Sequence, residues 1–362
     1  MTRSADSVLV LILNWNGWQD TLECLQSLRA GSYEDAQTVV IDNGSGDGSL
    51  DRIAAWAAAQ VDPVAVVRYT RGEAEAGGDD QREEAAFAGL PHHRRLILID
   101  NGDNLGFAAG NNVGIRFALG RGSRYVLLLN NDTVVGSTAI AAMVRLLEEQ
   151  PQLVGVTPRI LYYDTDRVWN CGGDLTALGG RRYHWHGRRA DETPQDGWRQ
   201  ISFITGCAAL LRTDLFCHVG LLSERFFFGE EDFEFAQRLR RARLPLACCY
   251  GATIRHKVSR SLAGAAQGPQ ADALANRIRL HYLNRFIDMR GYYPRPLWEA
   301  WRLAYLAYVA LLLTLRYRFA PRRTLPLLRS VWVESAQLQG VSRATFERVL
   351  RGEPAVAEGE RP

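Results

Sequence analysis

Val8–Gly17, VLVLILNWNG, is an apolar run that stops abruptly at two asparagines. Its first six residues are rich in β-formers, which predicts a strand buried on both faces, as in a parallel sheet. Similar short apolar runs recur at Thr38–Ile41, Leu96–Ile99 and Tyr125–Leu129. Helical patterns lie between and after them, at Thr21–Arg29, Leu50–Gln60, Gly106–Leu119 and Ser137–Glu149. This alternation predicts an α/β fold with a mostly parallel sheet, and ligands bind such sheets beyond the carboxyl ends of the strands.

Two stretches depart from the alternation. Arg68–Arg95 is dense in charged and small residues and poor in apolar ones, so we expect a mobile surface insertion there. Trp169–Trp198 is filled with aromatic, glycine and arginine residues, which indicates irregular loops or an edge ribbon. A helical pattern returns at Phe233–Arg243.

Composition limits the classes of protein that fit. The 362 residues are 47% hydrophobic and 23% charged, which excludes global disorder. Their 43 basic and 40 acidic side chains nearly balance, which argues against a nucleic-acid partner. Six cysteines without a CxxC pair suggest buried, reduced thiols in a cytoplasmic protein. Met1–Asp6 holds no apolar segment, so we do not expect export by a signal peptide.

A second long apolar run lies near the carboxyl terminus. Leu303–Leu315, LAYLAYVALLLTL, is shorter than the roughly 20 residues that a membrane-spanning helix needs. Its flanks are aromatic and basic: Trp298, Trp301, Arg302, Arg316, Arg318, Arg322 and Arg323. The run predicts either a helix lying in a membrane interface or a buried helix packed on the core.

Polar side chains gather where the predicted strands end. Asp42 either accepts hydrogen bonds from a base or ribose, or caps the glycine-rich turn that follows it. Asp132, after Asn130 and Asn131, either holds a divalent cation against a diphosphate or belongs to an ordinary turn.

A third cluster, Glu230–Glu234, places four carboxylates within five residues, directly after three phenylalanines and a glycine. Desolvation and mutual repulsion would raise a carboxyl pKa there, as a general base requires. Alternatively the acids favour the start of a helix. His256, a lone histidine, is by itself either structural or a ligand.

In order and spacing these motifs resemble the family 2 inverting glycosyltransferases of the GT-A fold, especially bacterial rhamnosyltransferase-like members, over about residues 7–290. Each motif is weak alone, and their succession makes the resemblance specific. The matching stretches are Val10–Gly17, Val40–Ser49, Asn104–Asn112, Leu127–Asp132, Thr205–Gly206 and Glu231–Glu234. Two departures are the Arg68–Arg95 insertion and the final Glu234, where aspartate is common in the family.

The resemblance implies roles for particular residues. Asp232 matches the catalytic base, and Glu231 or Glu234 could share that role. Asp132 matches the last acid of the family's metal-binding motif, and His256 matches a second ligand for Mg²⁺ or Mn²⁺. The substrate-binding set that it implies is Asn14, Asn16, Asp42, Asn104, Gly106, Asn111, Asn130, Asn131, Thr205, Gly206 and Glu234. We expect the acceptor at Cys171–Phe228, where Trp169, Trp185 and Trp198 either stack on sugars or pack in the core.

These expectations define one hypothesis: a GT-A domain at 1–290, a helical, membrane-facing region at 291–350 and a disordered tail at 351–362. The enzyme would move a sugar from a nucleoside-diphosphate donor, dTDP-rhamnose or a UDP-sugar, to a glycan or lipid-linked acceptor at the inner face of the cell membrane. Two alternatives are a nucleotidyltransferase acting on a sugar phosphate and a non-catalytic nucleotide- or glycan-binding protein. The first would be expected to carry a basic phosphate loop near Asn14–Gly17, and the second would not need the acids of Glu230–Glu234.

Overall fold

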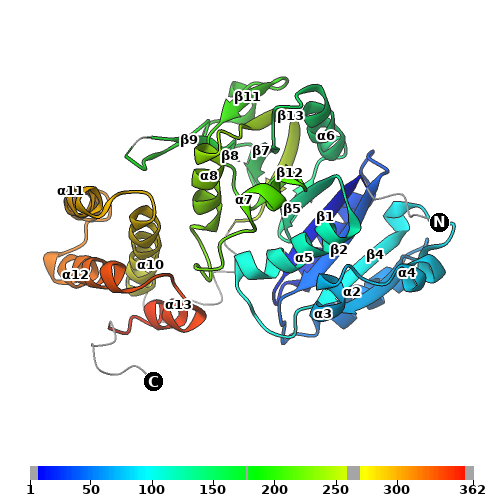
Figure 1. Ribbon diagram of the computed structural model, residues 1–362, viewed down its shortest axis with the longest axis horizontal. Coiled ribbons are helices and arrows are strands. Elements are labelled where there is room, and N and C mark those ends of the chain that lie inside the picture. The colour runs from blue at the N-terminus through cyan, green and yellow to red at the C-terminus, as the bar shows by residue number, and fades with distance from the viewer. Residues whose placement is uncertain (1–6, 177, 259–269, 355–362) are drawn as a thin grey trace.

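The computed structural model describes residues 7–176, 178–258 and 270–354, coloured along the chain in Figure 1. Met1–Asp6 and most of the expected tail, 355–362, lie outside the described residues. The main sheet contains β1 (Val8–Asn14), β2 (Ala36–Asp42), β3 (Ala65–Thr70), β4 (Arg95–Asp100), β5 (Tyr125–Asn130), β6 (Thr133–Val135), β7 (Gly155–Tyr162), β8 (Val168–Asn170), β11 (Trp198–Ile201), β12 (Ala208–Arg212) and β13 (Leu246–His256). The order is β11-β13-β7-β12-β5-β1-β2-β4-β3, with β6 on β13 and β8 on β7.

The amino-terminal half of this sheet is parallel. β1 runs parallel to β2 and β5, and β4 runs parallel to β2 and β3. β12 enters antiparallel between β5 and β7, so the complete sheet is mixed but mostly parallel. The predicted α/β class is therefore confirmed.

The strand register gathers the polar residues at one edge. Asn14 lies opposite Asp42, Asp42 lies opposite Asp100, and Leu13 lies opposite Asn130. Because these strands are parallel and in register, their carboxyl ends finish side by side. Chain segments far apart in sequence thus meet at a single line along the sheet.

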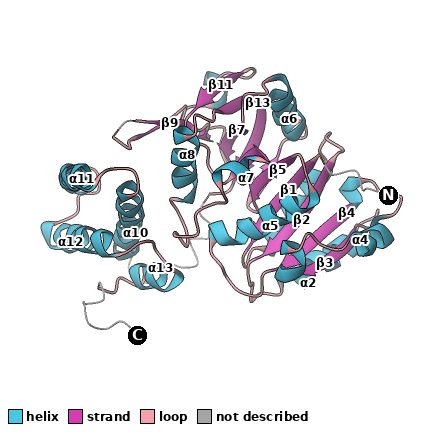
Figure 2. Cartoon of the chain, viewed as in Figure 1, coloured by secondary structure: helices cyan, strands magenta, loops and turns pink. Residues whose placement is uncertain are grey.

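Helices cover both faces of the sheet, as Figure 2 shows. One face is covered by α1 (Trp18–Arg29), α2 (Ser49–Ala58) and α6 (Ala139–Glu149), whose apolar sides pack in one core cluster. The other is covered by α5 (Phe107–Arg121), α7 (Leu215–Val219) and α8 (Glu231–Arg241). A small separate ribbon pairs β9 (Gly173–Leu175) with β10 (Arg181–Tyr183), in line with the expected edge ribbon, and η2 (Ala190–Glu192) follows it.

The Arg68–Arg95 segment is regular structure, so the expectation of a loose insertion is wrong. It completes β3 and forms α3 (Arg71–Glu75), α4 (Asp80–Phe87) and η1 (His92–Arg94). Few apolar side chains hold it, but Phe87 is buried and Glu83 forms a two-pronged ion pair with Arg121 at 2.7 Å. A buried, bidentate ion pair with a residue far along the chain replaces the missing apolar anchors.

The carboxyl-terminal residues form a helical unit: α10 (Gln270–Arg290), α11 (Arg295–Leu315), α12 (Pro321–Gln337) and α13 (Arg343–Leu350). In Figure 1 these helices gather beside the sheet domain, next to α8. The unit has its own apolar core, and α13 also packs on Phe227 and Phe228, just before α8. No helix among the described residues is long and apolar enough to cross a membrane.

Candidate active site

A cavity of 740 Å³ opens at the carboxyl edge of the sheet. Strand ends line one side of it, the start of α8 lines a second, and α10 and α13 line a third. Of the catalytic, metal-binding and substrate-binding residues expected from the sequence, those on its wall are Asn104, Gly106, Asn130, Asn131, Asp132, Thr205, Gly206, Glu231, Asp232 and His256. The fold therefore brings together motifs from five separate stretches of chain.

Asp42 and Asn14 lie just behind this wall in a hydrogen-bonded network. The Asp42 carboxylate accepts from Asn14 Nδ2 at 2.7 Å, from the Ser45 backbone N–H at 2.9 Å and from Ser45 Oγ at 2.7 Å. Thr21 Oγ1 in turn donates to Asn14 Oδ1 at 2.8 Å. Asp42 is only 2% exposed, so these contacts fix its orientation. Asn16 organises the same turn, because its Oδ1 accepts the Gly46 N–H at 2.8 Å.

Asn43, which the motif analysis did not single out, stands on the cavity wall. Its Nδ2 donates to Asn104 Oδ1 at 2.9 Å and to the Gly106 carbonyl at 3.1 Å. Gly106 has a φ of +85°, and a Cβ there would lie 2.4 Å from the Phe227 carbonyl oxygen, so only glycine fits. The Phe107 N–H donates to that same carbonyl at 2.9 Å, which ties this loop to the segment before α8.

Asp132 and His256 face each other across the end of β13. Asp132 Oδ1 lies 3.0 Å from His256 Nε2, and both side chains are buried. Trp169 packs edge-on against the His256 ring, with centroids 4.5 Å apart. Asn131 points the other way and donates to Asn14 Oδ1 and the Gly17 carbonyl.

This pair fits a divalent cation that also binds phosphate oxygens. Carboxylate oxygen and imidazole nitrogen are ligands that Mn²⁺ accepts, and Mg²⁺ is commonly held by one or two carboxylates plus phosphate. Among the described residues no cluster of three or more His, Cys, Asp or Glu is arranged for a metal ion. A cation held by Asp132 and His256 would thus take further ligands from a substrate or from water.

The acid cluster begins α8 in a constrained backbone. Glu230 has a φ of +93°, unusual for a residue with a side chain, and its buried carboxylate pairs with Arg181 from β10. The Arg181 guanidinium also stacks 3.3 Å from the centroid of the Phe233 ring. These contacts hold the start of α8 so that Glu231 and Asp232 reach the cavity wall.

The carboxyl groups of Glu231 and Asp232 differ in acidity. Burial, together with the charge of Asp232, raises the Glu231 pKa to about 8. Burial raises the Asp232 pKa to about 6, while nearby Arg181 acts to lower it. At neutral pH Asp232 is therefore mainly ionised and Glu231 mainly protonated.

Other predicted residues lie off the cavity wall. Glu234 is bound by Arg238 Nε at 2.9 Å, and Asn111 donates to the Phe107 carbonyl at 2.9 Å. Trp169 does line the cavity, but Trp185 donates to Tyr250 Oη and Trp198 lies on the outer strand β11. Trp185 and Trp198 therefore have no access to a ligand in this cavity.

The wall formed by the helical unit carries residues that the motifs did not point to. Asn284 of α10 donates to the Phe228 and Gly229 carbonyls at 3.0 and 2.7 Å. His281 opens onto the cavity, where desolvation and the charges of Arg181 and Arg285 lower its pKa. It is therefore a neutral imidazole, able to donate and accept one hydrogen bond each. No local sequence signal marks these positions, because long-range packing brings them to the site.

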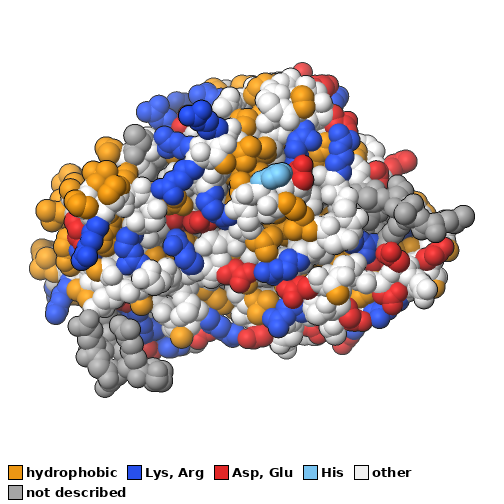
Figure 3. Space-filling view, viewed as in Figure 1, with side chains coloured by type: hydrophobic (Ala, Val, Ile, Leu, Met, Phe, Trp, Pro, Cys, Tyr) orange, Lys and Arg blue, Asp and Glu red, His pale blue; other side chains and the backbone are white. Residues whose placement is uncertain are grey.

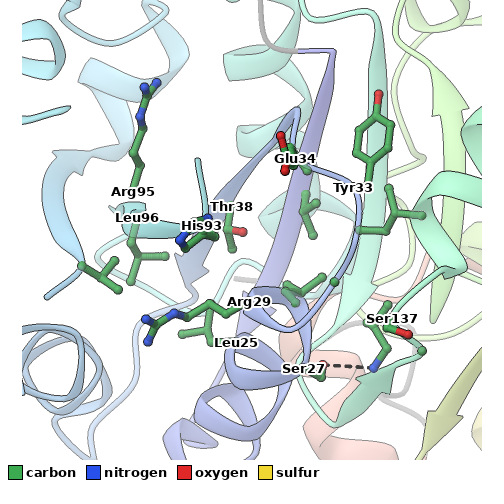
Figure 4. Close-up of a pocket in the computed structure, with 18 of the residues that line it drawn as sticks. Leu25, Ser27, Arg29, Tyr33, Glu34, Thr38, His93, Arg95, Leu96 and Ser137 are labelled. Carbon is green, nitrogen blue, oxygen red and sulfur yellow. Dashed lines mark hydrogen bonds between the residues drawn. The ribbon is translucent and has the colours of Figure 1, made fainter. Parts of the chain in front are cut away.

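A smaller cavity of 260 Å³ lies at the opposite edge of the sheet, near the starts of β2 and β4 (Figure 4). Two of its polar side chains are already engaged: Ser27 Oγ accepts the Val135 N–H at 3.0 Å, and Arg29 donates to Gln60 at 2.7 Å. The carboxyl-edge cavity, with its buried acids, is the candidate active site.

A mixed sheet of this order, with polar strand ends and an acid-bearing helix around one cavity, is the architecture of GT-A proteins. The family model described as "Glycosyltransferase like family 2" matches residues 5–271, and the chain belongs to that family.

The chain is 26% identical over 168 residues to "Low-salt glycan biosynthesis hexosyltransferase Agl10" of Haloferax volcanii, covering 43% of this chain and 50% of that protein. It is 22% identical over 197 residues to rat (Rattus norvegicus) "Hyaluronan synthase 2", covering 53% of this chain and 35% of that protein. The matches thus span half or less of these relatives. A solved mannosyltransferase of Pyrobaculum calidifontis, PcManGT, in complex with GDP-Man and Mn²⁺, aligns with a TM-score of 0.50 at 15% identity, over 91% of this chain and 86% of that one, which supports the fold.

Proposed function

We propose that this protein is an inverting glycosyltransferase that moves a sugar from a nucleoside-diphosphate donor to a hydroxyl of a glycan or lipid-linked acceptor. One observation carries the proposal: a single cavity joins the asparagine-rich strand ends, the Asp132–His256 pair and the ionised Asp232. The strand ends and the Asp132–His256 pair would bind the donor and its diphosphate. Asp232 would take the proton of the acceptor hydroxyl.

The donor lies along the strand ends. The nucleoside faces the Asp42–Asn14 network and Asn104, whose side chains are already oriented by hydrogen bonds. The relatives' names and the Pyrobaculum complex with GDP-Man favour a hexose donor in general, and dTDP-rhamnose or a UDP-sugar is the finer hypothesis.

Asp132 and His256 would hold a Mg²⁺ or Mn²⁺ ion, as the Mn²⁺ in the Pyrobaculum complex suggests. Such an ion, when bound, supplies positive charge that stabilises the departing diphosphate. Asn131 keeps the turn that carries Asp132 in place through its hydrogen bonds to β1 and the Gly17 carbonyl.

Asp232 acts as the base. Its carboxylate takes the proton of the acceptor hydroxyl while the hydroxyl oxygen forms a bond to the anomeric carbon. The bond from that carbon to the diphosphate oxygen breaks, and the nucleoside diphosphate leaves with the electron pair. Attack opposite the leaving group inverts the anomeric centre. A pKa of about 6 suits this role, because Asp232 is ionised at neutral pH yet remains basic enough to accept a proton.

The test is a panel of nucleoside-diphosphate sugars offered with and without Mg²⁺ or Mn²⁺, measuring nucleoside diphosphate release and the configuration of the product. We expect release with at least one donor that depends on the cation, and a product of inverted configuration. Donor binding without sugar transfer to any glycan or lipid-linked acceptor would favour a binding protein, and a retained configuration would contradict the single displacement.

A further inference from the structure

The helix α11 has two unlike faces. Its inner face packs in the core of the helical unit through Trp298, Trp301, Val309 and Leu313. The outer face leaves Leu303, Leu311 and Leu315 exposed by 63%, 56% and 69%. These leucines recur at multiples of four residues, so they form one continuous stripe along the helix. Figure 3 shows hydrophobic side chains gathered at this end of the molecule.

The charge around this stripe is mainly positive, because the nearby acids Glu299 and Asp272 are paired with Arg302 and Arg323. Residues 300–333 contain six arginines and no aspartate or glutamate. Arg302 is buried against Trp332, whereas Arg316, Arg318 and Arg322 are exposed where α11 passes into α12. Leu325, 65% exposed at the start of α12, adds a further apolar side chain beside them. An exposed apolar stripe bordered by an excess of arginines marks an interaction surface for an anionic, apolar partner.

We propose that this surface, the exposed side of α11 with the α11–α12 turn, docks on the surface of an anionic lipid bilayer. Leucine side chains would enter the boundary between headgroups and acyl chains, and the arginines would face anionic headgroups. A second copy of the chain fits poorly, because it would bring its own arginine-rich surface against this one. The inner face of α11 is committed to the helical unit, so the helix lies along the membrane.

The proposal is independent of the glycosyltransferase assignment, but the two are compatible. α10, which packs against α11 and α12, also lines the candidate active site. Docking would therefore hold the site close to the membrane, where a lipid-linked acceptor is found.

The experiment is flotation of the whole protein with vesicles of phosphatidylcholine, alone or mixed with phosphatidylglycerol. We expect binding to the mixed vesicles that weakens with salt. Leu311→Glu/Leu315→Glu should weaken it at least about tenfold, because two exposed leucines that enter the headgroup–acyl boundary contribute more than that in transfer free energy. Replacing Arg316, Arg318 and Arg322 by glutamine should weaken it roughly fivefold per arginine. The matched control is Val61→Glu, at a fully exposed apolar residue between α2 and β3, which should bind as the wild type does.

Thermal unfolding and light scattering accompany each variant, so that a folding defect or a change of oligomeric state is recognised. Equal binding by wild type and Leu311→Glu/Leu315→Glu, both folded, would overturn the proposal. So would the absence of vesicle binding together with a dimer that Leu311→Glu disrupts, because a second copy would then cover the stripe. Neither result depends on sugar transfer, so failure here leaves the proposed reaction to its own test.

Discussion

Two sides of the cavity, the strand ends and the start of α8, satisfy their polar groups in opposite ways. At the strand ends, buried Asn14, Asp42 and Asn43 make hydrogen bonds to one another or to neighbouring loops. At the start of α8, Glu231 is buried with one carboxylate oxygen lacking a hydrogen-bond partner, and Glu230 holds an unfavourable φ. The strand-end side is relaxed and preorganised. The α8 side is strained, because burying its acids without full hydrogen bonding is unfavourable in free energy.

This difference suits two separate functions, substrate binding at the strand ends and proton transfer at the start of α8. Binding gains when groups are already oriented, since no ordering cost remains when the ligand arrives. Proton transfer gains when an acid is desolvated, because its pKa then rises toward the working pH. We expect mutations at the strand ends to act on affinity and stability, and mutations at the start of α8 to act on turnover and its pH dependence.

The largest expected effect is that of Asp232→Asn. The amide cannot take the acceptor proton, so turnover should fall about 100- to 10,000-fold, the usual contribution of a general base. Donor affinity, measured by equilibrium titration, should change little. Glu148→Gln, an exposed acid on α6, serves as the control. Near-native turnover in Asp232→Asn would contradict the contrast between a binding side and a catalytic side, because the α8 side would then contribute no base.

Arg181→Met tests whether the strained start of α8 is held from outside. It leaves Glu230 buried and unpaired, which should cost about 3–5 kcal/mol in the free energy of unfolding. Arg181 lowers the Asp232 pKa, so its loss should move the acid limb of the rate profile upward from about pH 6.

In the wild type the rate should fall as the pH drops through about 6, because Asp232 takes up a proton. The double variant Arg181→Met/Glu230→Gln should recover part of the stability, since it removes the orphaned charge. An unmoved acid limb in folded Arg181→Met would separate Arg181 from the base.

The relaxed side was largely predictable from the sequence, and the strained side only in part. Apolar runs that end in Asn14, Asp42 or Asp132 indicate both a strand and the edge where it finishes, so their meeting follows from parallel topology. The four acids of Glu230–Glu234 are equally visible. The contacts that hold them are not visible, because Arg181 comes from a three-residue strand and Asn284, which binds the Phe228 and Gly229 carbonyls, from a helix outside the motifs.

The prediction for the Arg68–Arg95 segment was wrong for a related reason. Its charged composition resembles a solvated loop, and nothing local shows that Glu83 will be buried against Arg121. Tertiary contacts of this kind decide structure without leaving a periodic pattern.

Asp42→Asn probes the relaxed side and should have an intermediate effect. The amide must place a donor against the Asn14 amide, the Ser45 backbone N–H or the Ser45 hydroxyl, all of which now donate to Asp42. We expect a loss of about 1–3 kcal/mol in the free energy of unfolding and a matching loss in donor affinity. Asp51→Asn, an exposed acid on α2, is the control. A drop in turnover at saturating donor, with affinity intact, would contradict the assignment of binding to this side.

The last and smallest effect is that of Glu231→Gln, which tests whether burying this acid destabilises the folded protein. With a pKa of about 8 when folded and an ordinary value of 4.5, Glu231 favours the folded state most at low pH, and this stabilisation is lost as pH rises through about 8. Glutamine resembles the protonated acid at every pH. The variant should therefore match the wild type near pH 5 and exceed its free energy of unfolding at pH 9. Denaturant unfolding across that range measures the difference, with exposed Glu84→Gln as a control that stays level with the wild type. If Glu231→Gln were instead less stable at pH 9 than at pH 5 by as much as the wild type, the acid at the start of α8 would be no more costly than the acids at the strand ends.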